Sequence, residues 1–507
     1  VEEHGTLKGP YTEAEAERIV GPLFVPNPRF VIDQGGKKRP VDDGSVYKQN
    51  ATISVPWKLQ LGGVDEVVAI ATTILKCVDD SRTIRIKLPC GTTLEGTLSP
   101  EWSIEDVREL VGRLGDMKGA YRQLASYPGH RYASVVTVLD AAGELRHFLA
   151  LALLFGQSGA VYGFNRVSRF LSVVAAVKCD LINSPYYDDF TQIEFKKLAF
   201  SARQCFQDLF EILGFELALD PKKNKDFAPI FEPLGVRVNL SDSKNGIVYL
   251  EAKPSRVEEI TAICEGHVSK NEMSSSDTSS LVGKLRFLRE GYFGRCGATA
   301  LRELQRHESA YEPGPLPSKL VTSLRWLVNF FLTAPPRKID CFGTSAPVHI
   351  FTDGASEPER VTVGGVLFEL DFQPEAFGAI VPDGIVAKWR SGRHWQVIGQ
   401  AELAPVFIAT KLWEQRLRNR HVIIWIDQNA ARQGLIKGYS PSEHSAAVID
   451  SALEALSRVG AFPWFARVPT TANIADLPSR LKWDELRQIV PGYLERVVSA
   501  GAWAGLE

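Results

Sequence analysis

The sequence lacks several features that would point to other classes of protein. No apolar run approaches the roughly 18 residues of a membrane-spanning helix, so we expect no membrane partner. The seven cysteines are scattered without a C-x-x-C pair, which predicts free thiols and an intracellular location, in the cytoplasm or the nucleus. A net charge of -2 excludes a uniformly basic surface, so any contact with nucleic acid has to come from local basic patches.

The length of the chain and its clusters of Gly, Pro and Ser indicate how it is divided into domains. At 507 residues it exceeds the roughly 250–300 residues at which one hydrophobic core stops growing, so we expect two or three domains. Clusters of Gly, Pro and Ser predict boundaries near residues 250, 335 and 490, with a short tail over 491–507. The sequence starts without Met or a signal-peptide pattern, and we expect a fragment or a processed product.

A basic helical stretch occupies the second part, over 251–335. Helical spacing continues from Ser280 to His307, and the serine-rich segment 269–280 before it is typical of a flexible loop with Ser276 or Asp277 as the N-cap. The basic residues form either a solvated face or a surface that grips a nucleic-acid backbone. They are Lys284, Arg286, Arg289, Arg295, Arg302 and Arg306.

The third part, over 336–490, alternates strands and helices. Its apolar patterns predict helices over 400–417 and 442–460, and strands over 348–353, 361–370, 378–389, 421–427 and 462–468. Three strands followed by alternating helices and strands predict a mixed sheet with helices packed on it. The whole chain is therefore expected to be multidomain, combining α+β and α/β folds.

Two adjacent acids occupy the tip of a predicted hairpin. The segment Tyr186-Tyr187-Asp188-Asp189 lies between the short apolar segments LINSP and FTQIEF. Two carboxylates about 4 Å apart repel by roughly 4 kcal/mol at an effective dielectric of about 20, so folds that keep them together generally do so around a cation. Taken alone, such a pair is more often a solvated turn, and the neighbouring sequence decides between the two interpretations.

The motifs around this hairpin occur in the order found in reverse transcriptases. The segment Asp116-x-x-x-Ala120-Tyr121 resembles their first catalytic motif, and Tyr186-x-Asp188-Asp189 resembles their third. Further segments resemble the fingers clamp, the L-P-F-G loop with its following F-Q-R position, the fourth motif and the primer grip. They are, in that order, Lys38 to Asp43, Leu153 to Ser158 with Phe164-Asn165-Arg166, Leu213-Gly214-Phe215 with Asp220 to Lys223, and Pro233 to Val236.

The resemblance implies a right-hand polymerase of fingers, palm and thumb that copies RNA into DNA. In such enzymes a primer 3′-hydroxyl attacks an α-phosphate with the help of two Mg²⁺ ions about 3.5–4 Å apart, with Mn²⁺ as the alternative metal. Asp116 and Asp188, supported by Asp189, are the expected ligands, because carboxylate oxygens suit Mg²⁺. The implied domains are fingers and palm over 1–250 and thumb or connection over 251–335.

Two sets of contact residues follow from the same resemblance. Tyr121 stands at the position of the steric gate that excludes a ribose 2′-hydroxyl, although it could instead simply pack under the sheet. Lys38 and Arg39 are expected to neutralise the triphosphate, and Lys222 or Lys223 to protonate the leaving pyrophosphate. The alternative is that these basic residues are only solvated. Nucleotide contacts are expected from Lys38, Arg39, Tyr121, Gly156, Gln157, Lys222 and Lys223, and nucleic-acid contacts from Tyr186, Tyr187, Leu234, Gly235, Lys284, Arg286 and Arg289. Leu154 departs from the family, which usually has proline there.

Four acids in the third part fall at predicted strand ends and helix starts: Asp353, Glu402, Asp427 and Asp476. Each alone would be a cap or a surface charge. In this order they resemble the catalytic set of ribonuclease H, which hydrolyses the RNA strand of an RNA–DNA hybrid with two metal ions. The His that this family often has before its last Asp is missing from the loop 468–472, and His444, the nearest upstream, is expected on a helix surface.

A polymerase followed by ribonuclease H is the order found in retroelement and retroviral polymerases. The loop at Leu153 and the segment Asp476 to Arg480 look closest to elements of the DIRS-like type. The implied partners are an RNA template, a DNA primer, the RNA–DNA hybrid and dNTPs, while the oligomeric state stays open. Three rivals remain, namely a domesticated nucleic-acid-binding protein with little or no catalysis, an RNA-templated RNA polymerase and a DNA polymerase that does not copy RNA.

Overall fold

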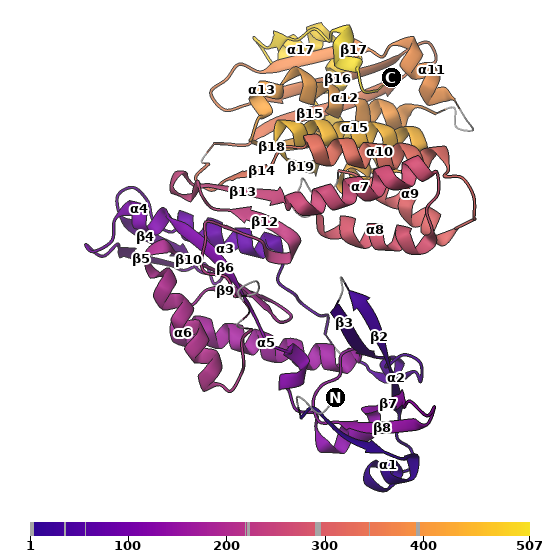
Figure 1. Ribbon diagram of the computed structural model, residues 1–507. Helices are drawn as coiled ribbons and strands as arrows, with labels where there is room; N and C mark the ends of the chain where they lie inside the picture. Colours follow the sequence, from indigo (N-terminus) through magenta and orange to yellow (C-terminus); the bar gives the residue numbers. More distant parts are fainter. Residues whose placement is uncertain are drawn as a thin grey trace. The chain divides into compact units, whose positions relative to one another are not determined.

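The structure is a computed structural model with mixed α and β elements and several separate sheets (Figure 1). It describes residues 5–34, 37–55, 57–218, 220, 224–288, 296–343, 345–391 and 396–506. The chain divides into two compact units, Val1–Pro233 and Leu234–Glu507, which are described separately. None of the helices in the described ranges combines the length and apolarity that crossing a membrane requires.

The first unit contains a five-stranded sheet near the N-terminus. Its order is β1 (Leu7–Tyr11), β8 (Leu145–Ala150), β7 (Val135–Leu139), β2 (Pro26–Gln34) and β3 (Lys37–Asp42), accompanied by α1 (Glu13–Val20) and α2 (Gln49–Thr52). Strands β2 and β3 form an antiparallel hairpin. At its base, Arg29 contacts both oxygens of buried Asp42, at 2.7 and 3.0 Å, and this paired geometry fixes the register of the two strands.

A three-stranded antiparallel sheet forms the second half of this unit. Strand β10 (Asp189–Phe195) lies between β6 (Leu110–Asp116) and β9 (Asn183–Tyr186), so the hairpin predicted around the two acids is confirmed. The other elements are α3 (Val64–Lys76), β4 (Thr83–Lys87), β5 (Thr93–Thr97), α4 (Ile104–Arg108), α5 (Ser158–Cys179), α6 (Ala199–Ile212) and β11 (Ile230–Phe231). Aromatic rings of β10 and α6, namely Phe190, Phe206 and Phe210, fill the core under the sheet.

The second unit opens with strands and a group of helices. The elements are β12 (Val236–Asn239), β13 (Ile247–Ala252), α7 (Pro254–Lys270), α8 (Ser275–Leu288), α9 (Ala298–Ser309), α10 (Ser318–Thr333) and β14 (Arg337–Asp340). The prediction of a long loop capped at Ser276 or Asp277 is wrong. Helix α8 already begins at Ser275, because the Ser274 hydroxyl accepts the backbone N–H of Asp277 and caps the first turn. The predicted helix over 280–307 corresponds to the end of α8 and most of α9.

A six-stranded mixed sheet forms the rest of this unit, as the sequence predicted. Its order is β19 (Phe462–Arg467), β18 (His421–Ile426), β15 (Val348–Ser356), β16 (Val361–Phe368), β17 (Glu375–Ile380) and β20 (Leu494–Glu495). Strands β15 to β17 are antiparallel, and β18, β19 and β20 join in parallel. The helices are α11 (Asp383–Arg390), α12 (Ile398–Leu412), α13 (Glu414–Leu417), α14 (Asn429–Lys437), α15 (Glu443–Val459), α16 (Asp476–Ser479) and α17 (Trp483–Ile489).

One predicted strand of this sheet is wrong. The segment 378–389 was expected to be extended, but β17 ends at Ile380 and α11 begins at Asp383. Pro382 stands just before the helix, where its fixed φ and missing N–H favour a helix start. The apolar residues that suggested a strand, Ile385 and Trp389, are instead four residues apart on the buried face of α11.

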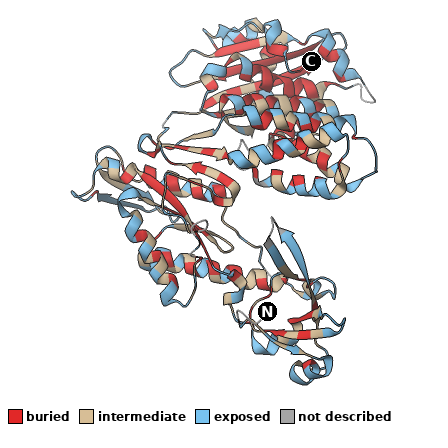
Figure 2. Ribbon diagram, viewed as in Figure 1, coloured by how far each residue is buried: buried red, intermediate tan, exposed pale blue. Residues whose placement is uncertain are grey.

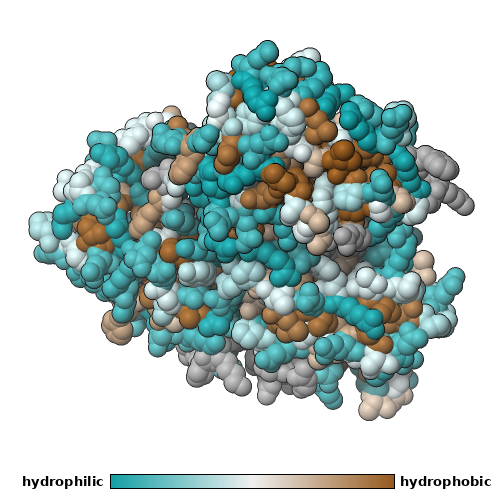
Figure 3. All heavy atoms as spheres, turned by 90° about the horizontal axis from the view of Figure 1, so that it is seen from above, coloured by the Kyte–Doolittle hydropathy of each residue, from teal (hydrophilic) through white to brown (hydrophobic). Residues whose placement is uncertain are grey.

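The helices α8 to α10 share one hydrophobic core with the mixed sheet and its helices. Leu324 and Leu327 of α10 belong to the same cluster as Leu456 of α15, and buried residues continue across both regions (Figure 2). The contact is also polar, since the indole N–H of Trp326 donates to Glu454 at 3.1 Å. The visible outer surface is mainly hydrophilic, with apolar residues in separate groups (Figure 3).

Two glycines let helices lie directly on the strands of the mixed sheet. A Cβ at Gly354 on β15 would overlap the backbone of Ala401 in α12. A Cβ at Gly364, the neighbour of Asp353 on β16, would overlap the backbone of Ser479 in α16. Both positions therefore require glycine because helix and strand backbones touch there.

The contact at Gly354 predicts a large effect from adding one methyl group. Gly354→Ala should lower the free energy of unfolding by about 1–3 kcal/mol, since the rigid backbone of α12 must move to admit it. The matched control is Gly384→Ala in α11, where an added Cβ meets nothing within 4 Å. Urea unfolding measures both variants, and equal stabilities would contradict the described packing.

Candidate active sites

Three acids of the first unit meet at one end of its three-stranded sheet. Asp116 is the last residue of β6 and is the Cα partner of Asp189 on β10. The backbone N–H of Met117 donates to the carbonyl of Asp188 at 3.0 Å, which holds the hairpin turn against the end of β6. Antiparallel register therefore brings together acids that are far apart in the sequence. Asp116 itself is buried.

A cavity of about 1120 Å³ opens beside these acids within the first unit. Its wall combines segments next to the five-stranded and three-stranded sheets with the loop before α5. The sequence predictions that line it are Lys38, Arg39, Tyr121, Tyr187 and Asp188, together with Leu153, Leu154 and Phe155. This volume is somewhat above the range of about 300–1,000 Å³ that is usual for small-molecule sites.

Tyr121 lines this cavity and is also packed against aromatic neighbours. Its ring centroid lies 4.7 Å from that of Phe164 and 5.9 Å from that of Phe155. Burial, together with nearby Tyr187 and Asp188, raises the pKa of Tyr121 to about 12. The packing fixes the ring in the cavity wall, so Tyr121 both packs against its neighbours and faces the cavity.

The positive charges of the cavity differ in what they can bind. Arg29 is already neutralised by its ion pair with buried Asp42. Lys38 and Arg39 are exposed residues on β3 and line the same cavity. These two are therefore better suited than Arg29 to meet an anionic ligand, because an exposed cation can exchange partners at little expense.

The loop before α5 is tied down by residues from β3 and α2. Asp42 donates its N–H to the carbonyl of Phe155 at 3.1 Å, and Asn50 donates its side-chain N–H to the carbonyl of Gly156 at 3.0 Å. The Asn50 side-chain oxygen also accepts the N–H of Ser158 at 2.8 Å. These bonds fix the loop that contains Leu154.

Gly156 and Gln157 are not among the cavity-lining residues. Gly156 has a φ of 119°, and an added Cβ would overlap the carbonyl oxygen of Asp42. The buried Gln157 side chain donates to Asn27 at 3.2 Å and to Gln49 at 3.0 Å. Both residues hold the loop to its neighbours, which differs from the nucleotide contact expected of them.

The other residues that the sequence predicted to contact nucleotide or nucleic acid are half-buried, exposed or outside the described residues. Lys222, Lys223 and Arg289 are outside them. Lys284 is paired with Glu259 at 2.6 Å, and Arg286 is exposed on α8. Leu234 and Gly235 form a turn with positive φ values of 52° and 77° at the start of the second unit. The rings of Tyr186 and Tyr187 meet edge to face at 5.1 Å.

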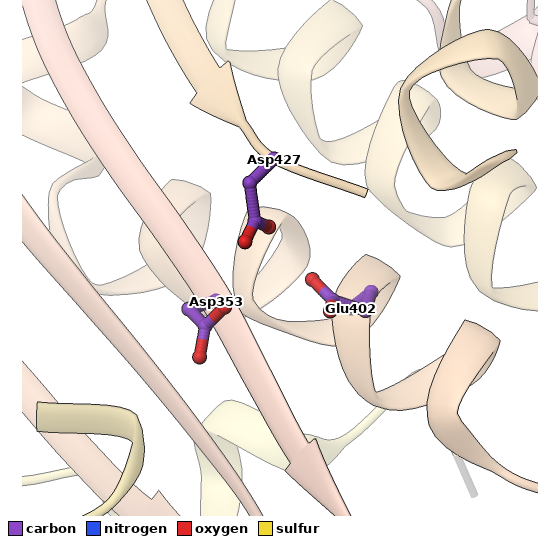
Figure 4. Close-up of side chains that lie close together, drawn as sticks. All are labelled: Asp353, Glu402 and Asp427. Atoms are coloured by element: carbon purple, nitrogen blue, oxygen red, sulfur yellow. The ribbon is translucent and has the colours of Figure 1, made fainter. Parts of the chain in front are cut away.

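A second group of acids lies in the mixed sheet of the second unit. Asp353 comes from β15, Glu402 from α12 and Asp427 from the residue after β18, and their side chains point toward one another (Figure 4). One carboxylate oxygen of each lies within 4.8 Å of those of the other two. The close contact of α12 with β15 at Gly354 places Glu402 beside Asp353.

The electrostatics of this group suit a divalent cation. Burial, together with the neighbouring acids, raises the pKa of Asp353 to about 6 and that of Glu402 to about 9. One oxygen of Glu402 and one of Asp427 are buried without a hydrogen-bond partner. Buried polar atoms are normally satisfied, so these oxygens are available to a ligand that carries positive charge. Oxygen ligands of this kind are those that Mg²⁺ prefers.

The fourth acid, Asp476, begins α16 beside this group. It accepts a hydrogen bond from Arg480 at 2.8 Å, and its charge raises the pKa of both Asp353 and Glu402. Asn473 is buried and donates its side-chain N–H to the carbonyl of Thr352 at 3.1 Å. Asn473 therefore ties the loop before α16 to β15, next to Asp353.

His444 does not approach the acids through any hydrogen bond of the described residues. It lies in the first turn of α15, where its Nε2 is 2.8 Å from the carbonyl of Ser391. This position agrees with the expectation that it is a helix residue. Sequence reasoning missed Asn50 and Ser479, since neither carries a charge or belongs to a quoted catalytic position.

The chain matches no model of a known protein family, and a search of curated proteins found no match. The assignment of a function therefore rests on the two groups of acids and on what surrounds them. In both groups, acids from separate elements meet because of strand register or close backbone packing.

The raised pKa of Glu402 predicts a pH dependence of stability. Because its folded pKa is about 9 against a usual 4.5, the folded protein keeps a proton that the unfolded chain releases. The stability from this proton is complete below the unfolded pKa and is lost as the pH rises toward the folded one. In EDTA at about pH 8, Glu402→Gln should therefore raise the free energy of unfolding by on the order of 1 kcal/mol.

The control for this variant is Glu414→Gln, which removes an acid paired with Arg418 on the surface of α13. It should unfold like the parent at every pH between about 6 and 9, because exposed ion pairs contribute little. Denaturant titrations at several pH values measure both. If Glu402→Gln is no more stable than the parent in EDTA, the described burial of this acid is wrong.

Proposed function

We propose that the chain is an RNA-directed DNA polymerase of a retroelement with a ribonuclease H domain behind it. The observation that carries the proposal is the meeting of Asp116 with the Asp188-Asp189 turn beside a cavity lined by Lys38, Arg39 and Tyr121. Those residues were expected to act together from motif order alone. Their convergence in one site is what a nucleotidyl-transfer centre requires, because charge, acid and shape must meet there.

The proposed parts of the polymerase follow the elements of the structure. The hairpin β2–β3 with the N-terminal sheet would serve as fingers, β6, β10 and β9 as palm, and helices α8 to α10 as thumb. The proposed metal ligands are Asp116 and Asp188, with Asp189 supporting them. The proposed contacts to the triphosphate come from Lys38 and Arg39, which line the cavity on β3.

Each proposed polymerase residue has a physical task. Bound divalent cations, Mg²⁺ or Mn²⁺, would activate the attacking hydroxyl and steady the charge on the phosphates. Lys38 and Arg39 would attract and orient the triphosphate by charge. Tyr121, held by Phe155 and Phe164, presents a rigid ring to the cavity and would exclude the 2′-hydroxyl of a ribonucleotide.

The proposed nuclease centre consists of Asp353, Glu402, Asp427 and Asp476. The residues fit divalent cations, because buried oxygens of Glu402 and Asp427 have no hydrogen-bond partner. A cation there would lower the electrostatic strain that raises the pKa of Glu402. The substrate would be the RNA strand of a hybrid, recognised through backbone and groove shape.

Primer extension tests the polymerase. On poly(rA)/oligo(dT) with dTTP and Mg²⁺, Asp188→Asn should reduce extension at least about 100-fold. The reason is that the metal ions that stabilise charge at the reacting phosphates lose a ligand. Asp208→Asn, which changes an exposed acid of α6 in the same unit, should leave extension unchanged. Extension that persists in Asp188→Asn would contradict the assignment.

The same assay separates the rival functions. An RNA polymerase would extend with UTP in place of dTTP, and a polymerase restricted to DNA would extend on poly(dA) but not on poly(rA). A domesticated nucleic-acid-binding protein would bind the primer–template and extend nothing. Only extension on the RNA template with dTTP agrees with the proposal.

Cleavage of a hybrid tests the nuclease. Asp427→Asn should reduce cleavage of labelled RNA in an RNA–DNA duplex at least about 100-fold and leave primer extension intact, because it touches only the second site. The control is Asp484→Asn on α17, whose side chain is 93% exposed. Cleavage by Asp427→Asn at the parental rate would contradict the assignment, and so would cleavage that needs no divalent metal.

A further inference from the structure

The short helix α16 is fixed on the mixed sheet by backbone contact. A Cβ at Gly364 on β16 would overlap the backbone of Ser479, and one at Gly378 on β17 would overlap the carbonyl oxygen of Pro478. Gly364 and Gly378 are cross-strand partners, so the helix spans two adjacent strands. A shift of the helix would create either a gap or an overlap, which confines Asp476 and Ser479 to one position.

Ser479 connects this helix to the first acid of the second site. Its side chain is fully buried, and its hydroxyl donates to one carboxylate oxygen of Asp353. The same hydroxyl lies 3.0 Å from the backbone carbonyl of Asp476. A hydroxyl has one proton, and the carboxylate is the stronger acceptor, so the bond to Asp353 dominates.

The bond restricts how the Asp353 carboxylate can turn. Because Ser479 holds one of its oxygens, the Asp353 carboxylate is kept in one orientation relative to Glu402 and Asp427. One oxygen of each of these acids lies within 4.8 Å of an oxygen of Asp353. Fixed orientation of a carboxylate raises its affinity for a cation, because less freedom is lost on binding. The bond also joins β15 to α16, which carries Asp476.

We propose that Ser479 is a positioning residue, whose buried hydroxyl orients Asp353 for metal binding and locks α16 with Asp476 beside it. This inference rests on the proposed nuclease function, because it takes the four acids as the metal ligands. Ser479 touches neither substrate nor metal in this account, and it acts through Asp353. The sequence of the segment Asp476-Leu477-Pro478-Ser479-Arg480 alone predicted no such role for Ser479.

The test measures Mn²⁺ binding by the full chain. Asp116→Asn and Asp188→Asn are introduced first, so that binding reports only the second site, and Mn²⁺ is titrated by electron paramagnetic resonance. In this background Ser479→Ala should weaken Mn²⁺ binding about 10- to 100-fold, as is usual when a partner of a metal ligand is lost. Ser479→Thr keeps the hydroxyl and should restore binding to within about threefold of the parent.

Two controls separate positioning from folding. Ser457→Ala removes another buried serine hydroxyl, on α15, and should bind Mn²⁺ like the parent. Thermal unfolding of Ser479→Ala and Ser457→Ala shows whether either variant is simply unfolded. In hybrid cleavage, Ser479→Ala should raise the Mg²⁺ concentration needed for half-maximal rate more than it lowers the rate at saturating Mg²⁺.

Each outcome of the titration has one meaning. Weak binding in Ser479→Ala with recovery in Ser479→Thr supports the inference. Binding by Ser479→Ala within twofold of the parent overturns it and leaves the proposed nuclease standing. An absence of Mn²⁺ binding in the background chain, with Asp353, Glu402, Asp427 and Asp476 intact, overturns both the inference and the proposed nuclease.

Discussion

The backbone brings acids together at two places, and both proposed activities depend on this constraint. In the first unit the constraint is strand register, which pairs Asp116 with Asp189. In the second it is backbone contact, because Gly354 lets α12 bring Glu402 onto β15 beside Asp353. Without a cation the repulsion and burial raise the pKa of Glu402 to about 9, so the fold tolerates strain at this site.

The second unit places its acids and its basic helices in one compact body. Helices α8 to α10 lie next to α15 (Figure 1) and share a hydrophobic cluster with the mixed sheet. Trp326 of α10 also donates to Glu454 of α15. Because the two regions are packed through one continuous hydrophobic core, they have little freedom to move independently. The basic helix α8 therefore keeps a fixed relation to Asp353, as the proposed nuclease needs if α8 holds its substrate.

Local patterns in the sequence were sufficient to predict where the acids lie along the elements, the hairpin and the mixed sheet. Acids at strand ends, alternation of apolar residues and the order of the motifs are all readable without tertiary contacts, and Asp188 at a hairpin turn follows from them. The strand expected over 378–389 failed because its apolar pattern fits both periods, and Pro382 decided for α11.

Residues that act through distant partners could not be predicted. Gln157 holds Asn27, 130 positions away, and nothing near either residue in the sequence announces the bond. Ser479 reaches Asp353 across 126 positions in the same way. Neutral side chains of this kind give no pattern of charge or periodicity, so their roles appear only when the fold brings the partners together.

Iron-directed cleavage of the chain itself measures the central claim, that both groups of acids bind divalent cations. Fe²⁺ bound in place of Mg²⁺ generates hydroxyl radicals with ascorbate and peroxide, and these cut the backbone close to the metal. The account predicts two sets of cuts, near Asp116 and Asp188 and near Asp353 and Glu402, each suppressed by excess Mg²⁺. Cuts spread evenly along the chain, or none at either group, would contradict it.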